Sequence, residues 1–187
     1  MTDNSLTELL LDAPIIAAVK SEDGLPKAIA SNSAVIFLLC GTVCNIGSLT
    51  EQVRTHGKQV FVHLDLVDGL ASRDIAADFI RQNTPANGII STRQNLIRRG
   101  RELGLTTIQR YFVHDSRALE NILRQSCEAD LLDILPGTIP KTLRRIAQSA
   151  RQPLIASGLL SDKEDIMSAL AAGALAVSAT TPELWFL

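Results

Sequence analysis

Apolar and polar positions follow two alternating patterns along the whole chain. Apolar runs of about four to eight residues, which are typical of buried strands, recur at intervals of roughly 20 to 25 residues. The predicted strands are residues 14–19, 34–39, 58–65, 88–91, 106–112, 131–135, 153–157 and 174–178. Between them, apolar residues recur with the spacing of one buried helix face, as in Leu143, Ile146, Ala147 and Ala150. The pattern therefore predicts eight successive strand–helix units.

Regular alternation of strands and helices requires a parallel sheet, because each helix returns the chain to the edge where the previous strand began. Eight such units favour closure into a compact (β/α)8 barrel of the TIM type. The length of 187 residues is below the usual lower limit of about 200 for this fold. An open flavodoxin-like sheet with extra units is therefore the alternative. We expect one domain over residues 1–187, with residues 1–13 covering one end of the barrel.

Turns of small residues follow the last two predicted strands. The first turn is Ser157, Gly158 and Leu159, and the second is Ser178, Ala179 and Thr180. In a (β/α)8 barrel, the turns after the seventh and eighth strands commonly bind phosphate. Small residues let backbone N–H groups approach an anion closely. The sequence thus predicts an anion site here, and the alternative is two ordinary tight turns.

The composition and net charge agree with this fold, and only one segment has an unusual charge. The chain is 46% hydrophobic and 4% aromatic, with a formal net charge of −2, which suits parallel strands covered by helices. Residues 93–124 stand apart, because they hold seven arginines, no lysine and three acidic residues. The chain begins without a basic and apolar signal segment, and no apolar run is long enough to span a membrane. We therefore expect a soluble, cytoplasmic protein with no membrane partner.

The three cysteines, Cys40, Cys44 and Cys127, are odd in number and lack a CxxC spacing. This pattern predicts neither a disulfide framework nor a zinc site, so we expect free thiols, no bound metal and no cofactor.

Polar residues gather at the other predicted strand ends. His63 and Asp65 are two positions apart and so share one side of their strand. Such a pair can bind a diol, hold a metal, or act as acid and base, or it can be a satisfied polar pair inside the barrel. Further polar residues at strand ends are Lys20, Arg93, Gln109, Arg110 and Asp133. With the two small-residue turns, they predict a site for a phosphorylated polyol, in which we assign no catalytic residue.

The helix predicted for residues 93–103 carries a cluster of positive charge. Arg98, Arg99 and Arg101 share an outward sector of this helix, and Glu102 is its only acidic residue. Guanidinium groups in such a cluster can bind phosphate backbones, and the alternative is a solvated helix face.

Six segments carry a resemblance to a known family. They are VHLDLVDG at 62–69, GIISTR at 88–93, IQRYF at 108–112, ILPG at 134–137, PLIASG at 153–158 and AGALAV at 172–177. As an ordered set they resemble the glycerol-3-phosphate-responsive antiterminator family, and the resemblance runs from about residue 14 to residue 185. It implies a barrel-like regulator that senses glycerol 3-phosphate and acts on the leader of glycerol-utilisation messenger RNA, so that transcription passes a terminator. The chain departs from the family pattern at Asp133, where glutamate is usual, at Ser157, where glycine is usual, and at Cys40 and Cys44.

Three functions remain open at this point. The first is the regulator that the resemblance implies, with glycerol 3-phosphate as effector and leader mRNA bound at Arg98, Arg99 and Arg101. The second is an enzyme acting on a small sugar or triose phosphate, with proton-transfer or Schiff-base chemistry at the barrel rim. The third is a ligand-binding protein without RNA binding, favoured by the scarcity of aromatic residues for base stacking. No oligomeric state is predicted.

Overall fold

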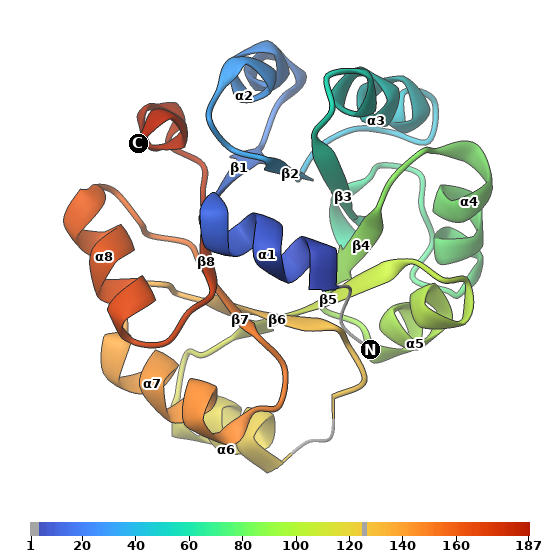
Figure 1. Cartoon of the computed structure of the whole chain (residues 1–187). Coiled ribbons are helices and arrows are strands. Elements are labelled where there is room, and N and C mark those ends of the chain that lie inside the picture. Colours follow the sequence, from blue (N-terminus) through green and yellow to red (C-terminus); the bar gives the residue numbers. More distant parts are fainter. Residues whose placement is uncertain (1–3, 125–126) are drawn as a thin grey trace.

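The chain closes into a parallel β-barrel surrounded by helices (Figure 1). The computed structural model describes residues 4–124 and 127–187. The strands are β1 (Ile15–Val19), β2 (Val35–Leu38), β3 (Gln59–His63), β4 (Gly88–Ser91), β5 (Thr106–Phe112), β6 (Leu131–Leu135), β7 (Leu154–Ser157) and β8 (Ala176–Ala179). Each strand pairs in parallel with its neighbours in sequence, and β8 pairs with β1. The predicted (β/α)8 barrel is confirmed, and the open flavodoxin-like sheet is excluded.

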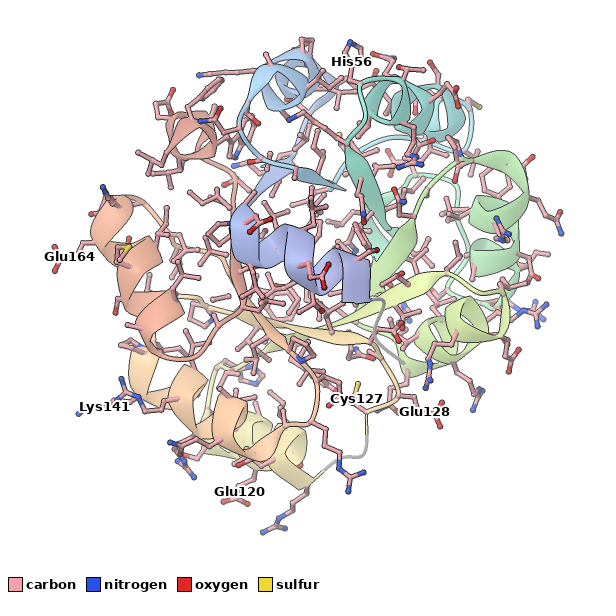
Figure 2. The ribbon with its side chains drawn as sticks, in the orientation of Figure 1. His56, Glu120, Cys127, Glu128, Lys141 and Glu164 are labelled. Carbon is pink, nitrogen blue, oxygen red and sulfur yellow. The ribbon has the colours of Figure 1, made fainter. Side chains whose placement is uncertain are left out.

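Short elements explain how a chain of this length completes the barrel. The helices are α1 (Asn4–Asp12), α2 (Leu25–Ala30), α3 (Ile46–Thr55), α4 (Ile75–Asn83), α5 (Gln94–Glu102), α6 (Ser116–Arg124), α7 (Pro140–Ser149) and α8 (Lys163–Ala171), with 3-10 turns η1 (Glu22–Gly24), η2 (Leu64–Leu66) and η3 (Pro182–Phe186). Charged residues such as Glu120, Lys141 and Glu164 point outward from the helix ring (Figure 2). No helix in the described ranges is long and apolar enough to cross a membrane.

Strand side chains alternate between the barrel interior and the helix layer. The interior cluster contains Phe37, Phe61, Ile90, Ile108, Leu131, Ile155 and Ala176, together with Leu6 and Leu10 of α1. Full burial of an aliphatic side chain such as Leu10 stabilises a fold by about 1.5–3 kcal/mol. Because α1 precedes β1 and lies across the barrel centre (Figure 1), it closes the amino end of the barrel. A ligand therefore has to enter from the carboxyl ends of the strands.

Gly88 shows how tightly the interior is filled. A Cβ atom at this position would lie 2.1 Å from the carbonyl oxygen of Thr106 and 2.7 Å from the ring of Phe61. Phe61 in turn forms an edge-to-face pair with Phe37, with ring centroids 5.9 Å apart. Only glycine fits beside this aromatic pair.

The carboxyl terminus differs from the sequence prediction. Residues 181–183 predict the start of a final α-helix, but the chain forms only the short 3-10 turn η3. Trp185 of this turn is buried, and its indole N–H donates to the carbonyl oxygen of Ala179 at 2.8 Å. Glu183 forms an ion pair with Lys27 of α2 at 2.9 Å, and this hydrogen bond lowers the pKa of Glu183. The Glu183 carboxylate is thus held by α2.

Candidate functional site

A layer of buried polar side chains lies at the carboxyl ends of the strands, next to the apolar interior. The layer consists of His63, Arg110, Asp133, Ser157 and Ser178, each two positions after a residue of the interior cluster. Strand periodicity places residues two apart on the same side of a strand, so all five face the barrel axis. Burying polar groups is unfavourable unless they form hydrogen bonds or ion pairs. Most members of this layer are therefore expected to have such partners.

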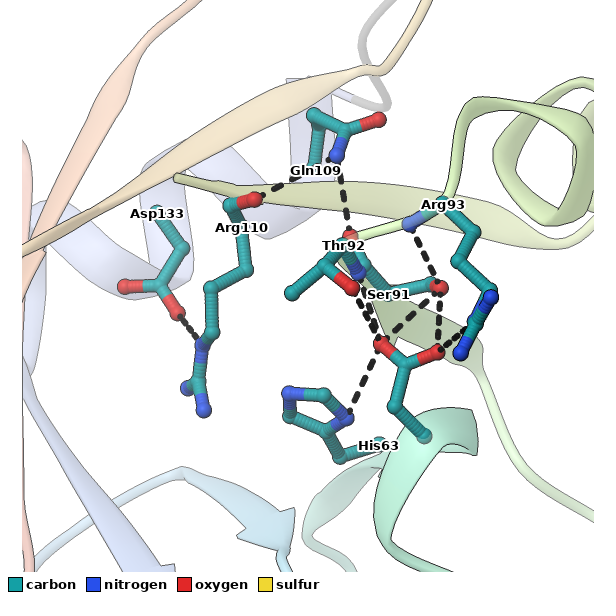
Figure 3. A network of polar contacts seen from close by, with 8 residues as sticks. His63, Ser91, Thr92, Arg93, Gln109, Arg110 and Asp133 are labelled. Carbon is teal, nitrogen blue, oxygen red and sulfur yellow. Dashed lines mark hydrogen bonds and ion pairs between the residues drawn. The ribbon is translucent and has the colours of Figure 1, made fainter. Parts of the chain in front are cut away.

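Arg110 and Asp133 form an ion pair at the centre of this layer. The Nε atom of Arg110 donates to Oδ2 of Asp133 at 2.7 Å (Figure 3). The side chain of Ser157 donates to the other carboxylate oxygen, Oδ1. Asp133 is fully buried, and Arg110 is 6% exposed. In the described part of the chain, nothing accepts a hydrogen bond from the two terminal nitrogens of Arg110, so they are available to an anion.

Arg110 lines a small pocket, here named the mouth pocket. It has a volume of about 80 Å³, and its walls include Arg110, Leu135, Leu160 and the two predicted turns, residues 157–159 and 178–180. Gly158 has φ of +77° and Leu159 has φ of +60°. A non-glycine residue in this region is strained, and such strain concentrates at binding sites. The two turns predicted to bind an anion thus line one pocket with a buried guanidinium.

His63 lies across the barrel from this pair, where β3 ends. Its Nδ1 atom is buried without a hydrogen-bond partner in the described ranges, because Oδ2 of Asp65 is 3.7 Å away. Burial, and then the positive charge of Arg110, lower the pKa of His63 to about 4, although the Asp65 carboxylate opposes them. His63 is therefore neutral at pH 7, and its unpaired Nδ1 lies next to the Asp65 carboxylate.

Asp65 is held by the loop that follows β4. Its carboxylate accepts hydrogen bonds from the Ser91 hydroxyl at 3.1 Å, the Thr92 N–H at 2.7 Å and the Thr92 hydroxyl at 3.0 Å. Nε of Arg93 also donates to it, at 3.2 Å. Four donors therefore tie the end of β3 to the end of β4, and Arg93 is engaged by Asp65.

The structure does not bring Gln109 to this site. Arg110 faces the barrel axis, so Gln109, one position earlier on β5, faces the helix layer. Its side-chain N–H donates to the carbonyl oxygens of Ser91, at 3.2 Å, and Arg110, at 3.3 Å. Lys20 follows β1 and is exposed at the same end of the barrel as the mouth pocket. Sequence reasoning named Arg110 among the polar residues at strand ends but gave it no role in the anion site, although its place two positions after the interior residue Ile108 indicates that it faces the barrel axis.

The arginines of α5 differ in their surroundings. Arg99 bonds through Nη2 to Asp78 of α4 at 2.6 Å and through Nη1 to Glu102 at 2.8 Å. Glu102 is the only acidic residue on the helix itself, but α4 supplies Arg99 with a second acidic partner, Asp78. Arg98 and Arg101 are exposed, and neither forms an ion pair with any residue that the structure describes.

The neutral state of His63 makes the fold less stable in mild acid. An unfolded chain protonates histidine with a pKa of about 6.5, whereas the folded chain protonates His63 only near 4. Between these values the unfolded state binds more protons, so the free energy of unfolding falls as the pH falls, and above 6.5 the contribution is constant. We expect a loss of about 2 kcal/mol between pH 7 and pH 5 from this group. Urea unfolding at both pH values measures it.

The matched variant is His63→Gln, which keeps a polar side chain but cannot take up the proton. Its stability should fall clearly less than that of the wild type between pH 7 and pH 5. The same pH dependence in both proteins would contradict the assignment to His63.

A family model described as "Glycerol-3-phosphate responsive antiterminator" matches residues 15–185. The chain is also 38% identical over 184 residues to an uncharacterized Escherichia coli protein, YgcP, and the match covers 97% of this chain and 96% of that protein. The sequence similarity thus extends over the whole barrel.

Two solved structures are similar throughout. A glycerol uptake operon antiterminator regulatory protein from Listeria monocytogenes is 33% identical with a TM-score of 0.87, over 91% of this chain and 94% of that one. A glycerol uptake operon antiterminator-related protein from Thermotoga maritima is 29% identical with a TM-score of 0.82, over 92% and 98%. The resemblance noted in the sequence is confirmed, and the chain belongs to the glycerol-3-phosphate responsive antiterminator family.

Proposed function

We propose that this protein is a regulator that binds glycerol 3-phosphate in the mouth pocket and acts on the leader mRNA of glycerol-utilisation genes, so that transcription passes a terminator. It would do so in the cytoplasm. The observation that carries the ligand site is the buried Arg110, which lines the mouth pocket together with the two turns predicted to bind an anion.

The phosphate belongs at Arg110. A guanidinium offers several N–H donors in a planar fork that matches phosphate oxygens. Asp133 takes only the Nε donor and so fixes the orientation of this fork. The turns at residues 157–159 and 178–180 add backbone close to the anion.

The glycerol hydroxyls belong on the His63 side of the layer. A neutral imidazole nitrogen can accept from, or donate to, a hydroxyl group, and Nδ1 of His63 is buried without a partner among the described residues. Asp133 keeps lone pairs beyond those that Arg110 and Ser157 use, so it is the second candidate contact. We assign a positioning role to Asp65: it holds the ends of β3 and β4 together and does not contact the glycerol hydroxyls directly.

The two departures from the family pattern at Asp133 and Ser157 form a hydrogen bond with each other. Ser157, where the family usually has glycine, donates its hydroxyl to Asp133, where the family usually has the longer glutamate. The shorter carboxylate and the added hydroxyl compensate for each other in size and in hydrogen bonding. This favours the same class of ligand as in the rest of the family.

Calorimetric titration of glycerol 3-phosphate, glycerol and inorganic phosphate tests the ligand. We expect glycerol 3-phosphate to bind at least about ten-fold more tightly than phosphate, because His63 adds hydroxyl contacts worth about 1.5 kcal/mol. Glycerol alone should give no measurable heat. Equal affinity for phosphate and glycerol 3-phosphate would show that the site binds an anion without recognising the glycerol hydroxyls. No turnover of triose phosphates is expected, since the family membership favours a regulator over an enzyme.

The RNA contacts are expected at Arg98 and Arg101, the α5 arginines that form no ion pair with a described residue. Replacing both by glutamine should weaken binding to a leader-RNA hairpin and flatten its salt dependence by about one unit of log slope per lost phosphate contact. Filter binding at several salt concentrations measures both quantities.

Arg99→Gln is the matched control on the same helix. Its guanidinium is already bound by Asp78 and Glu102, so this change should lower the melting temperature and leave the salt slope unaltered. If the double variant keeps wild-type affinity and slope, α5 is a solvated face. The next basic surface to test is then Arg144, Arg145 and Arg151.

A further inference from the structure

A second pocket lies on the outer face of β5, behind the layer that carries Arg110. It has a volume of about 220 Å³ and is lined by Gln94, Ile97, Arg98, Gln109, Cys127 and Glu128. We name it the outer pocket. Its walls are α5 and the residues just before β6, where Cys127 and Glu128 lie (Figure 2). At about 30 Å³ per water molecule, this is the space of about seven waters, which is comparable with one nucleobase.

An unpaired acceptor marks the buried wall of the outer pocket. Gln109 is 1% exposed, and its Oε1 atom has no hydrogen-bond partner in the part of the chain that the structure describes. The amide cannot be turned round, because its Nε2 atom donates to two carbonyl oxygens, those of Ser91 and Arg110. Figure 3 shows the amide oxygen pointing away from the mouth-side network. A buried acceptor without a partner is destabilising, and a ligand with an N–H group would supply the missing hydrogen bond.

The rest of the outer pocket fits a flat, amphipathic ring with an anion attached. Ile97 supplies an apolar wall, and Glu128 offers further acceptor atoms at the edge. Arg98 is exposed at the same edge and, among the described residues, has no ion pair. Nucleobases have apolar faces and N–H donors on their edges, and each is linked to a phosphate. Sequence-specific RNA recognition typically takes such bases from single-stranded loops and bulges.

We infer that the outer pocket takes one unpaired nucleobase of RNA, with an N–H of the base donating to Oε1 of Gln109 and its phosphate at Arg98. The inference rests on the proposed RNA-binding function and names the place where that function is exerted. Gln109 and Arg110 are consecutive on β5 and face opposite sides of the barrel wall. A ligand on Arg110 and a base on Gln109 thus act on the same strand, which gives effector binding a short route to the RNA.

The outer pocket contains its own reporter, the free thiol of Cys127. Alkylation of wild-type protein by iodoacetamide, followed by mass spectrometry of the peptides, measures the reaction of Cys127 and of the exposed Cys44, which lies in the β2–α3 loop. The probes are AMP, GMP, CMP, UMP, a leader-RNA hairpin, and ribose 5-phosphate as the control without a base. We expect the hairpin and at least one nucleotide to slow alkylation of Cys127 by about five-fold or more at saturation. Ribose 5-phosphate should have no effect, and Cys44 should react at the same rate throughout.

The result that overturns the inference is an unprotected Cys127 in protein saturated with leader RNA. Gln109→Met, which is similar in length but offers only a weakly accepting thioether sulfur, gives an independent measurement. Its affinity for the hairpin should fall about ten-fold with an unchanged salt slope, because the lost contact is to a base. Wild-type affinity in this variant would equally overturn the inference. If the wild type binds no leader RNA, the proposed function fails instead, and protection by the free nucleotides still decides whether the outer pocket accepts a base.

Discussion

Replacing Arg110 by glutamine is expected to reduce the affinity for glycerol 3-phosphate at least about 100-fold. Each charge-assisted hydrogen bond contributes about 1.5–3 kcal/mol, and the two terminal nitrogens of Arg110 have no hydrogen-bond partner among the described residues. Their joint loss corresponds to more than two orders of magnitude in the dissociation constant. Calorimetric titration measures the affinity.

The same change also leaves Asp133 buried without its cation. Removing one partner of a buried ion pair typically costs about 3–5 kcal/mol of stability, and Asp133 is fully buried. The control is therefore the double variant Arg110→Gln/Asp133→Asn, in which two neutral amides can hydrogen-bond to each other. It should recover most of the lost stability but none of the binding. Wild-type affinity for glycerol 3-phosphate in the double variant would show that Arg110 does not bind the ligand.

The second large effect is expected for Gly158→Val. Gly158 has φ of +77°, and an added Cβ would lie 3.1 Å from a methyl group of Leu135, inside the mouth pocket. A side chain here narrows the anion site, so the affinity for glycerol 3-phosphate should fall more than about ten-fold, which is about 1.4 kcal/mol. Separately, the left-handed backbone conformation should lower the free energy of unfolding by about 1–2 kcal/mol. The sequence alone suggests that this glycine can be replaced with little effect on the fold, and the positive φ argues against that.

Gly57→Val separates the two consequences. Gly57 has φ of +74°, but no atom lies within 4 Å of an added Cβ. It precedes β3 and so lies at the opposite end of the barrel from the mouth pocket. The control should lose similar stability, measured by urea unfolding, while glycerol 3-phosphate binding stays intact. Equal loss of affinity in both variants would show that the effect of Gly158→Val is a general consequence of destabilisation.

Local patterns were sufficient to predict the barrel and the two turns that line the mouth pocket. Each strand is a short apolar run bounded by turn residues, and predicted and observed limits differ by two residues at most. Where the predicted and observed limits differ, tertiary contacts determine where the element ends. The third strand is predicted to reach Asp65 but ends at His63, because Asp65 turns towards donors from the loop after β4. The sequence Ser161-Asp-Lys-Glu164 fits a capping box with Ser161 as the N-cap. The α8 helix is instead capped one position later by Asp162, whose side chain accepts the N–H of Asp165.

The roles of individual polar residues depended on neighbours far away in sequence. Gln109 and Arg110 look alike as polar residues on one strand, and only the direction of each side chain separates the two pockets. Arg99 looks free on its own helix, but Asp78 reaches it from α4. Hydrogen-bond partners on adjacent strands and helices leave no local periodic signal, so these assignments required the structure.

The most direct test of the account is the affinity for leader RNA measured with and without saturating glycerol 3-phosphate, in the wild type and in Arg110→Gln/Asp133→Asn. Coupling between two sites typically changes affinity about 5- to 150-fold. We predict a change of at least about five-fold in the wild type and none in the double variant, whose RNA affinity should match that of the ligand-free wild type. An RNA affinity that is the same in the wild type with and without glycerol 3-phosphate would contradict the proposal that this barrel is a ligand-responsive regulator.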